Sequence, residues 1–329
     1  MNHELPAGAA AFCNQLGIRY PVIGGAMYPC SNPELTAAVS TAGGIGILQP
    51  ISLTYVHGHD YRAGIRLMRS LTDKPIGMNA LIEKSSKKYQ QRMSEWIDIA
   101  LEEGIRFFVT SLGKPDWVAK RVHAVGGLVY HDVTELKWAR IGLDSGADGL
   151  ICVNNRAGGH AGQKSMQQLY EELNVLGAPL ICAGGIGGRD EFWQALDTGY
   201  VACQLGTRFI ASSECHASTA YKQAVIDAQE TDIVLSERVT GIPVSVINTD
   251  YIKRSGTRMG SLSRWMLASN KTKHWMRMFY GLKSIWQLKQ SLLGEMGEKD
   301  YWQAGKSVAE IDSIESCASI MQHLMTNKG

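Results

Sequence analysis

One histidine, surrounded by small residues, forms a candidate catalytic loop. In the segment "CVNNRAGGHAG", His160 follows Gly158 and Gly159 and precedes Gly162. Histidine is a suitable base near neutral pH, and glycine neighbours leave room beside the imidazole for a substrate and a flat cofactor ring. A histidine in an ordinary surface loop explains the same residues equally well, because the motif by itself shows no partner for the ring.

Two glycine-bearing turns could bind a phosphate. Gly184 and Gly185 end one apolar run in "AGGIGG", and Gly206 and Thr207 end the next in "QLGTRF". Glycine lets backbone N–H groups approach an anion closely, and the N-terminus of a following helix adds partial positive charge. One such turn is more often plain turn chemistry, but two on consecutive strands predict a phosphate cradle.

Three other histidines and the segment 305–307 are further candidates for a chemical role. His131 ends a further apolar run beside Asp132, as a rival base or a phosphate contact, although a structural hydrogen bond is the default. His57 and His59 flank a glycine without a third ligand in view, so no metal site is predicted. The segment 305–307 lacks the earlier glycine of a P-loop.

Eight apolar runs of strand length alternate with segments of helical period. The runs cover 20–27, 44–49, 75–81, 106–112, 127–133, 149–153, 178–186 and 200–207, and helices are expected at 33–42, 87–103, 115–124, 135–145, 165–176 and 190–198. Runs that are continuously apolar, such as "LICAGGI", are typical of parallel strands buried on both faces. The pattern predicts an α/β fold of the (β/α)8 TIM-barrel class, with a doubly wound sheet as the alternative. In a barrel of this class, the active site lies at the C-terminal ends of the strands.

The alternation stops after Thr207, which marks a second region. The stretch 251–294 holds nine Lys or Arg residues and no Asp or Glu, and 259–293 has a helical pattern in which Trp and Met alternate with bases. We expect a barrel over 1–214, completed by 299–329, and a mainly helical, cap-like insertion over 215–298. The preferred interpretation packs the Trp and Met rows inward, and a nucleic-acid or membrane surface is the alternative. Ser307 and Glu310 have the spacing of a capping box and predict the start of a last helix.

Composition narrows the class of protein. The 329 residues carry a net charge of only +2, and no run approaches eighteen apolar residues. These features predict a cytoplasmic protein with no membrane partner. The seven cysteines are odd in number and scattered, so buried free thiols are expected rather than disulfides or a zinc site. The sequence leaves a homodimer open.

Six segments resemble, in the same order, the nitronate monooxygenase (2-nitropropane dioxygenase) family. They are "YPVIGGAMYPCSNPELTAAVSTAGGIGIL", "KPIGMNALI", "NRAGGHAG", "APLICAGGI", "QLGTRF" and "YWQAGKSV". The resemblance runs from Gly17 to His323. It implies FMN at the barrel mouth, with His160 in the place of the catalytic histidine. The FMN-binding positions that it implies are Ala26, Met27, Asn79, Asp132, Gly159, Gly184, Gly185, Gly206 and Thr207, with Gln49 a weaker placement.

Two residues depart from the family pattern. Arg156 stands where many relatives have an acidic residue, and Asp132 stands where some have a lysine near the cofactor. Both changes leave the substrate open.

The resemblance implies an FMN-dependent oxidoreductase that oxidises nitronates or nitroalkanes with O2 to a carbonyl compound and nitrite. An NAD(P)H-dependent flavin reductase, of the enoyl-acyl-carrier-protein or quinone type, is the alternative on the same barrel, because its motifs are similar. A basic cap would suit an acidic carrier protein. The expected partners are a small-molecule substrate with O2 or NAD(P)H, and no nucleic acid.

Overall fold

Eight parallel strands close into a barrel in the order of the chain, β1 to β8, and the predicted (β/α)8 fold is therefore confirmed. The computed structural model describes residues 4–83, 86–238, 241–260, 283, 285–292 and 301–326. The strands are β1 (Val22–Gly24), β2 (Ile45–Leu48), β3 (Ile76–Leu81), β4 (Phe107–Ser111), β5 (Leu128–Val133), β6 (Gly149–Val153), β7 (Leu180–Ala183) and β8 (Ala202–Leu205).

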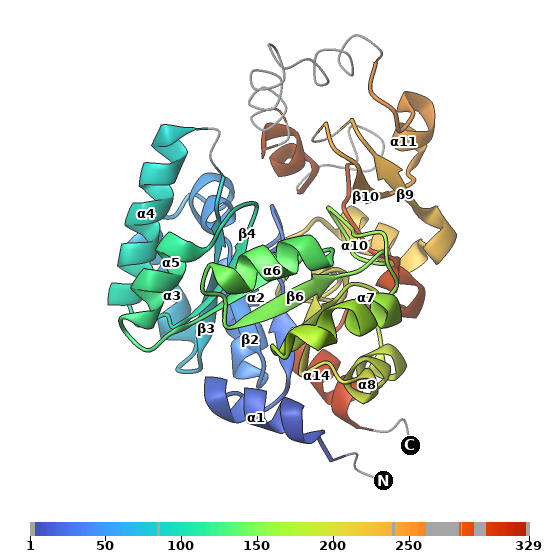
Figure 1. Ribbon diagram of the computed structural model, residues 1–329. Coiled ribbons are helices and arrows are strands. Elements are labelled where there is room, and N and C mark those ends of the chain that lie inside the picture. The colour runs from blue at the N-terminus through green and yellow to red at the C-terminus, as the bar shows by residue number, and fades with distance from the viewer. Residues whose placement is uncertain are drawn as a thin grey trace.

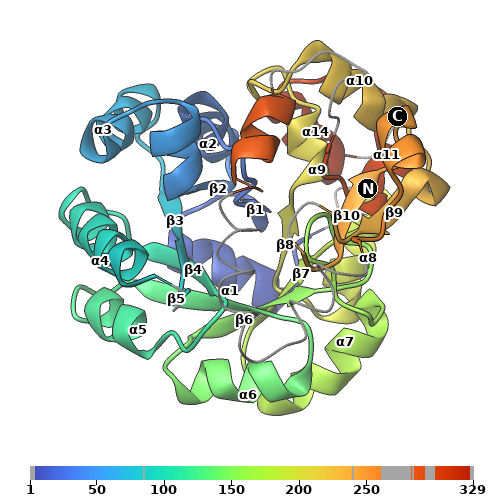
Figure 2. The ribbon, with the colours of Figure 1, turned by 90° about the horizontal axis from the view of Figure 1, so that it is seen from above.

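A ring of helices covers the outside of the barrel, as Figure 2 shows from above. These are α2 (Pro33–Thr41), α3 (Tyr61–Leu71), α4 (Lys87–Glu102), α5 (Asp116–His123), α6 (Leu136–Asp144), α7 (Met166–Leu173) and α8 (Arg189–Thr198). Several begin at a side-chain cap, which satisfies an N–H group of the first turn. The Ser165 hydroxyl, for example, accepts a hydrogen bond from the Gln168 N–H.

Alternate residues of each strand point into the barrel, and they fill it. The inner cluster includes Ile23, Val109 and Ile151. Helix α1 (Ala7–Leu16) closes the N-terminal end, where Phe12 packs edge-to-face against Tyr130 with ring centroids 5.8 Å apart. The interior below the strand ends is therefore a packed core, which leaves the C-terminal mouth as the place for a ligand.

The chain leaves the barrel after a short helix, α9 (Thr207–Ile210), and forms a second region over the mouth (Figure 1). That region contains α10 (Thr219–Asp227), an antiparallel hairpin of β9 (Ile233–Ser236) and β10 (Val244–Ile247), and α11 (Asp250–Ser255). Residues 285–292 are helical, but most of the expected basic helix 259–293 lies outside the described residues. The predicted boundaries at 214 and 298 stay predictions.

The C-terminal segment returns to the barrel. Helix α14 (Cys317–Met325) packs beside α2 and α8, where the Trp193 Nε1–H donates to the Leu324 carbonyl over 3.0 Å. The predicted capping box was wrong: the segment Lys306–Glu310 forms a 3-10 turn without a side-chain cap. The helix starts later, because the Ser316 hydroxyl accepts from the Ser319 N–H over 3.1 Å.

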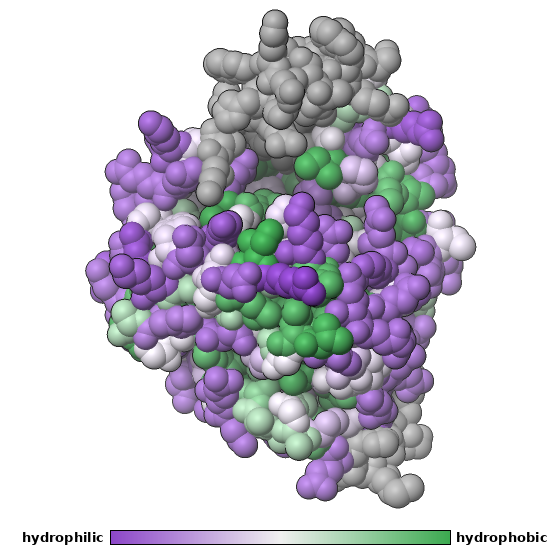
Figure 3. All heavy atoms as spheres, viewed as in Figure 1, coloured by the Kyte–Doolittle hydropathy of each residue, from purple (hydrophilic) through white to green (hydrophobic). Residues whose placement is uncertain are grey.

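All seven cysteines are buried and free, as predicted. Within the described ranges, no helix combines the length and the apolar character that a membrane crossing requires. Hydrophilic side chains dominate the face drawn in Figure 3, and hydrophobic ones gather around its middle.

Candidate active site

The loop that follows β6 is rooted on the neighbouring strand β7 by one buried asparagine. The Asn154 N–H donates to the Ala183 carbonyl over 3.0 Å, and its Nδ2 donates to the Gly184 carbonyl over 2.8 Å. Its Oδ1 accepts from the Arg156 N–H over 2.8 Å. The start of the His160 loop and the first glycine turn are therefore one hydrogen-bonded unit.

The far end of this loop is held by the cap. Gly159, with φ +66°, forms an isolated antiparallel bridge to Ser245 of β10, and the Ser245 N–H donates to its carbonyl over 2.8 Å. A positive φ is a conformation that glycine adopts without the strain of a side chain. The hairpin thus fixes the backbone immediately before His160.

His160 lies in this loop at the C-terminal end of the barrel. Its side chain keeps contact with solvent, yet desolvation by the protein around it lowers its pKa below the usual value. The lowered pKa favours the neutral imidazole, which is able to accept a proton. That is the state that a general base requires.

The turn after β7 has no room for side chains. Gly184 and Gly185 both have positive φ, +111° and +79°. A Cβ on Gly184 would lie 2.6 Å from the Ala157 nitrogen, and one on Gly185 would lie 2.7 Å from Arg156 Nε. Consecutive glycines of this kind expose backbone N–H groups in a concavity that suits an anion.

The turn after β8 contains the other two residues of the predicted cradle, Gly206 and Thr207. The Thr207 hydroxyl oxygen accepts a hydrogen bond from the Gly305 N–H over 2.9 Å, so its own proton remains available to a ligand. A Cβ on Gly206 would stand 3.5 Å from the Met27 sulfur, which brings the turn after β1 to the same place. Gly305, which precedes the 3-10 turn Lys306–Glu310, therefore holds the Thr207 side chain.

A cationic pair next to the cradle was not foreseen from the sequence. Arg156 Nη1 lies 2.8 Å from Glu230, and Lys306 Nζ lies 3.3 Å from the same carboxylate. The two bases lower the pKa of Glu230. The Arg156 side chain covers Gly185, so one guanidinium stands beside the glycine turn.

Three polar side chains occupy inward positions near the mouth. Asn79 is in register with Val109, Asp132 with Ile151, and Gln204 with Ile23, and each of these partners belongs to the inner cluster. Asp132 Oδ1 and Gln204 Oε1 are inaccessible and have no hydrogen-bond partner among the described residues. Ala26 packs against the same cluster. A ligand in the mouth would offer partners to these two atoms. Gln204 was not predicted as a residue of the mouth, although its place two residues before Gly206 could have indicated that it points inward.

Two other expected residues serve the fold. His131 faces the opposite side of β5 from Asp132: its Nδ1 lies 2.9 Å from the Thr110 hydroxyl, and its ring lies against Gly142 of α6. Burial lowers its pKa to about 4. Gln49 caps the turn after β2, because its Oε1 accepts from the Ser52 N–H over 2.6 Å. His131 therefore points away from the mouth, whereas Gln49 stays a prediction.

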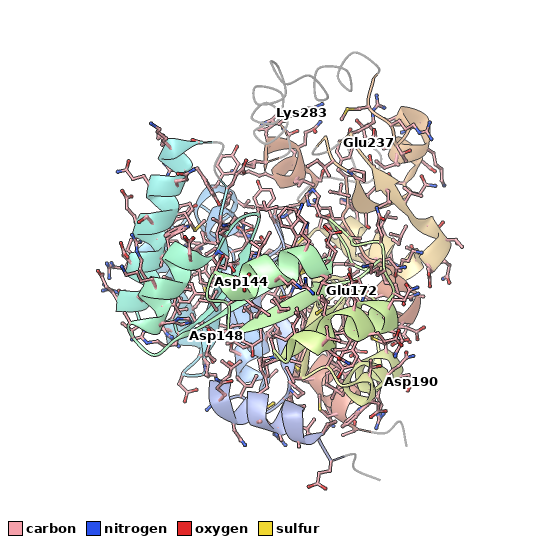
Figure 4. The ribbon with its side chains drawn as sticks, viewed as in Figure 1. Asp144, Asp148, Glu172, Asp190, Glu237 and Lys283 are labelled. Atoms are coloured by element: carbon pink, nitrogen blue, oxygen red, sulfur yellow. The ribbon has the colours of Figure 1, made fainter. Side chains whose placement is uncertain are left out.

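Carboxylates on the outer surface have structural partners of their own. Figure 4 shows Asp148 and Glu172 on the barrel body, away from the cap that carries Glu237 and Lys283. Asp148 accepts from the Val129 N–H over 2.7 Å and contacts His123, and Glu172 accepts from the Leu136 N–H over 3.2 Å. Asp148 and Glu172 therefore bind backbone N–H groups of the barrel body.

Two relatives are similar to this chain in sequence over most of its length. The chain is 26% identical to (3aS,4S,5R,7aS)-5-hydroxy-7a-methyl-1-oxo-octahydro-1H-indene-4-carboxyl-CoA dehydrogenase of Rhodococcus jostii over 89% of this chain and 80% of that protein. It is also 26% identical to a probable nitronate monooxygenase of Staphylococcus saprophyticus, over 73% of this chain and 78% of that one.

Solved structures share the fold. FabK from Thermotoga maritima superposes with a TM-score of 0.77 at 25% identity, over 95% of this chain and 94% of that one. Nitroalkane oxidase from Streptomyces ansochromogenes gives 0.73 at 21% identity, over 95% and 96% of the two chains. The family model described as nitronate monooxygenase matches residues 10–327. The chain is therefore an enzyme that belongs to the nitronate monooxygenase family of oxidoreductases.

Proposed function

We propose that this enzyme binds FMN at the barrel mouth and oxidises small nitronates and nitroalkanes with O2, with His160 as the base. Members of the family and FabK are flavoproteins, typically with FMN. The observation that carries the proposal is the hydrogen bond from Asn154 Nδ2 to the Gly184 carbonyl, which joins the loop that bears His160 to the glycine turn. A base and a phosphate cradle thus share one rigid support.

The described residues fit FMN. Gly184 and Gly185 have positive φ and pack closely against Ala157 and Arg156, a glycine turn of the kind that presents backbone N–H groups to an anion, and the Thr207 hydroxyl keeps a proton for a phosphate oxygen. The unpartnered oxygens of Asp132 and Gln204 face the interior, where a polar ring edge could satisfy them. We assign Ala26, Met27 and Asn79 to the ring, and Gly206 with Thr207 to the phosphate.

His160 would take the proton that a nitroalkane carries on the carbon next to the nitro group. The cap holds the backbone next to His160 through Gly159 and Ser245, which limits the movement of the loop when the proton is transferred. When bound, FMN supplies the electron acceptor for the oxidation, which the protein itself lacks. A nitronate has already lost this proton and needs only to be bound and oriented.

The test begins with the visible spectrum of the purified protein, which should show a bound flavin. The flavin should bleach without O2 when a nitronate is added, and slowly or not at all with NADH or NADPH. With O2, nitrite and a carbonyl compound should accumulate. A colourless protein that takes up no FMN on titration contradicts the proposal.

A second function has specific support from the comparisons. The FabK likeness covers 95% of the chain, and the Rhodococcus relative is named for a carboxyl-CoA substrate. Arg156 and Lys306 offer positive charge near the cradle, with about a third of each side chain exposed. These features suit an NAD(P)H-dependent reductase of an acyl thioester. Rapid anaerobic bleaching by NADH or NADPH would select this function over the first.

A further inference from the structure

One oxygen of the Asp132 carboxyl group makes no hydrogen bond to the described residues. Its side chain points into the barrel, because its register partner Ile151 and the residue two positions earlier, Tyr130, both belong to the inner cluster. It stands near the C-terminal end of β5, on the side of the barrel where the mouth lies. Its Oδ1 has no hydrogen-bond partner within the described part of the chain. The residue as a whole is half-buried, so a ligand in the mouth can reach the rest of the carboxyl group.

The titratable neighbours of Asp132 do not compensate its charge. His131 faces outward and contacts Thr110, and Cys152 of the adjacent strand β6 is a buried thiol whose pKa Asp132 helps to raise. Desolvation alone raises the pKa of Asp132 to about 7, with no contribution from a charged side chain among the described residues. A buried carboxylate without a counter-charge is costly, so the group keeps its proton up to neutral pH.

We propose that Asp132 donates its carboxylic acid proton, in a neutral hydrogen bond, to an acceptor on the polar edge of the flavin ring. The inference rests on the FMN binding proposed above. A protonated carboxyl is a donor, whereas a carboxylate only accepts. Gln204 faces the same interior from β8, and its orphaned Oε1 needs a donor. The pyrimidine edge of a flavin alternates carbonyl acceptors with an N–H donor, which matches both needs.

This assignment makes flavin binding depend on pH. Below neutral pH Asp132 carries the proton that the hydrogen bond needs. Above it, the group either keeps the proton at an energetic cost or becomes an anion beside an electron-accepting ring. If the bound flavin raises the pKa of Asp132 by one unit, the affinity falls about tenfold once the pH exceeds the raised value.

The test measures the Kd of the apoprotein for FMN and for riboflavin from pH 6 to pH 9. In the wild type both affinities should weaken in parallel by about tenfold, because riboflavin has the same ring and lacks the phosphate. In Asp132→Asn, whose amide donates at every pH, both should be nearly independent of pH. In Asp132→Leu, which cannot donate, both should be weak throughout. The flavin midpoint potential should show a break near pH 7 to 8 in the wild type and none in Asp132→Asn.

Three results would overturn the assignment: an unchanged pH dependence in Asp132→Asn, wild-type affinity in Asp132→Leu, or a pH dependence shown by FMN and not by riboflavin. The last would place the titrating group at the phosphate. Circular dichroism and thermal melting of each variant establish that it is folded. Failure of the proposed function is distinguishable, because the wild type would then bind neither ligand at any pH.

Discussion

The backbone N–H of Ser245 donates to the carbonyl of Gly159 over 2.8 Å, and this bond joins the cap to the residue before His160. The two residues lie on different parts of the fold, a hairpin strand and a barrel loop. The backbone that carries His160 is consequently held by both.

Replacing His160 should separate two substrates. His160→Asn removes the base, so nitroalkane turnover should fall by at least about 100-fold, while nitronate turnover and FMN content stay close to the wild type. Because desolvation lowers the pKa of His160, the wild-type kcat/KM for a nitroalkane should rise with pH through a midpoint below the usual pKa of histidine. Steady-state rates on both substrates provide the measurement. Equal losses on the two would place the base elsewhere.

The bond between the hairpin and the loop can be removed without touching His160. Ser245→Pro deletes the N–H donor, and nitroalkane turnover should drop about tenfold as the imidazole loses its fixed position. Ser245→Ala keeps the N–H and is the matched control, expected within about twofold of wild type on the same argument. FMN affinity should change in neither variant. Turnover that survives in Ser245→Pro would show that the bridge does not position the base.

The first glycine turn should tolerate no side chain. Gly184→Ala combines a positive φ with a Cβ 2.6 Å from the Ala157 nitrogen, so FMN binding should be lost and unfolding should become easier by about 1–3 kcal/mol. Gly177→Ala has a similar backbone, with φ +68°, but nothing within 4 Å of the added atom. Gly177→Ala should lower the free energy of unfolding by about 1 kcal/mol and leave the FMN affinity unchanged. FMN titration and denaturant melts compare the pair.

Arg156 and Lys306 should strengthen the binding of the FMN phosphate and leave the binding of the flavin ring unchanged. Arg156→Gln should weaken FMN binding about tenfold, leave riboflavin binding unchanged and reduce the salt dependence of the FMN affinity. Glu230→Gln frees both bases and should strengthen FMN binding. These partly exposed pairs contribute little to stability, about 1 kcal/mol or less, so melting temperatures should barely move. Parallel losses for FMN and riboflavin would assign Arg156 a purely structural role.

The barrel could be predicted because its strands are buried on both faces. Leu180–Ala183 and Ala202–Leu205 are apolar at almost every position, and the glycine turns that follow them mark the strand ends. The capping box at Ser307 was misleading, because local spacing permits a helix that tertiary packing replaced with a tighter turn.

The site was only partly predictable. His131 and Asp132 are adjacent in sequence, yet strand alternation sends one outward and the other inward. Which of them faces in depends on the register with the neighbouring strand, which no motif states. The contacts of Arg156 with Glu230 and with the Lys306 carbonyl span 74 and 150 positions. Contacts at such separations arise from chain closure and leave no local pattern.

The hydrogen bond between Thr207 and Gly305 spans 98 positions. The ribosome therefore adds the two residues at well-separated times, and the turn after β8 is complete only when both are present. A nascent chain can complete all eight strands on the ribosome while residue 305 is still untranslated. FMN should then bind only after the polypeptide is released. A chain that stalls before residue 305 would have the barrel but lack the Gly305 N–H that holds the Thr207 side chain.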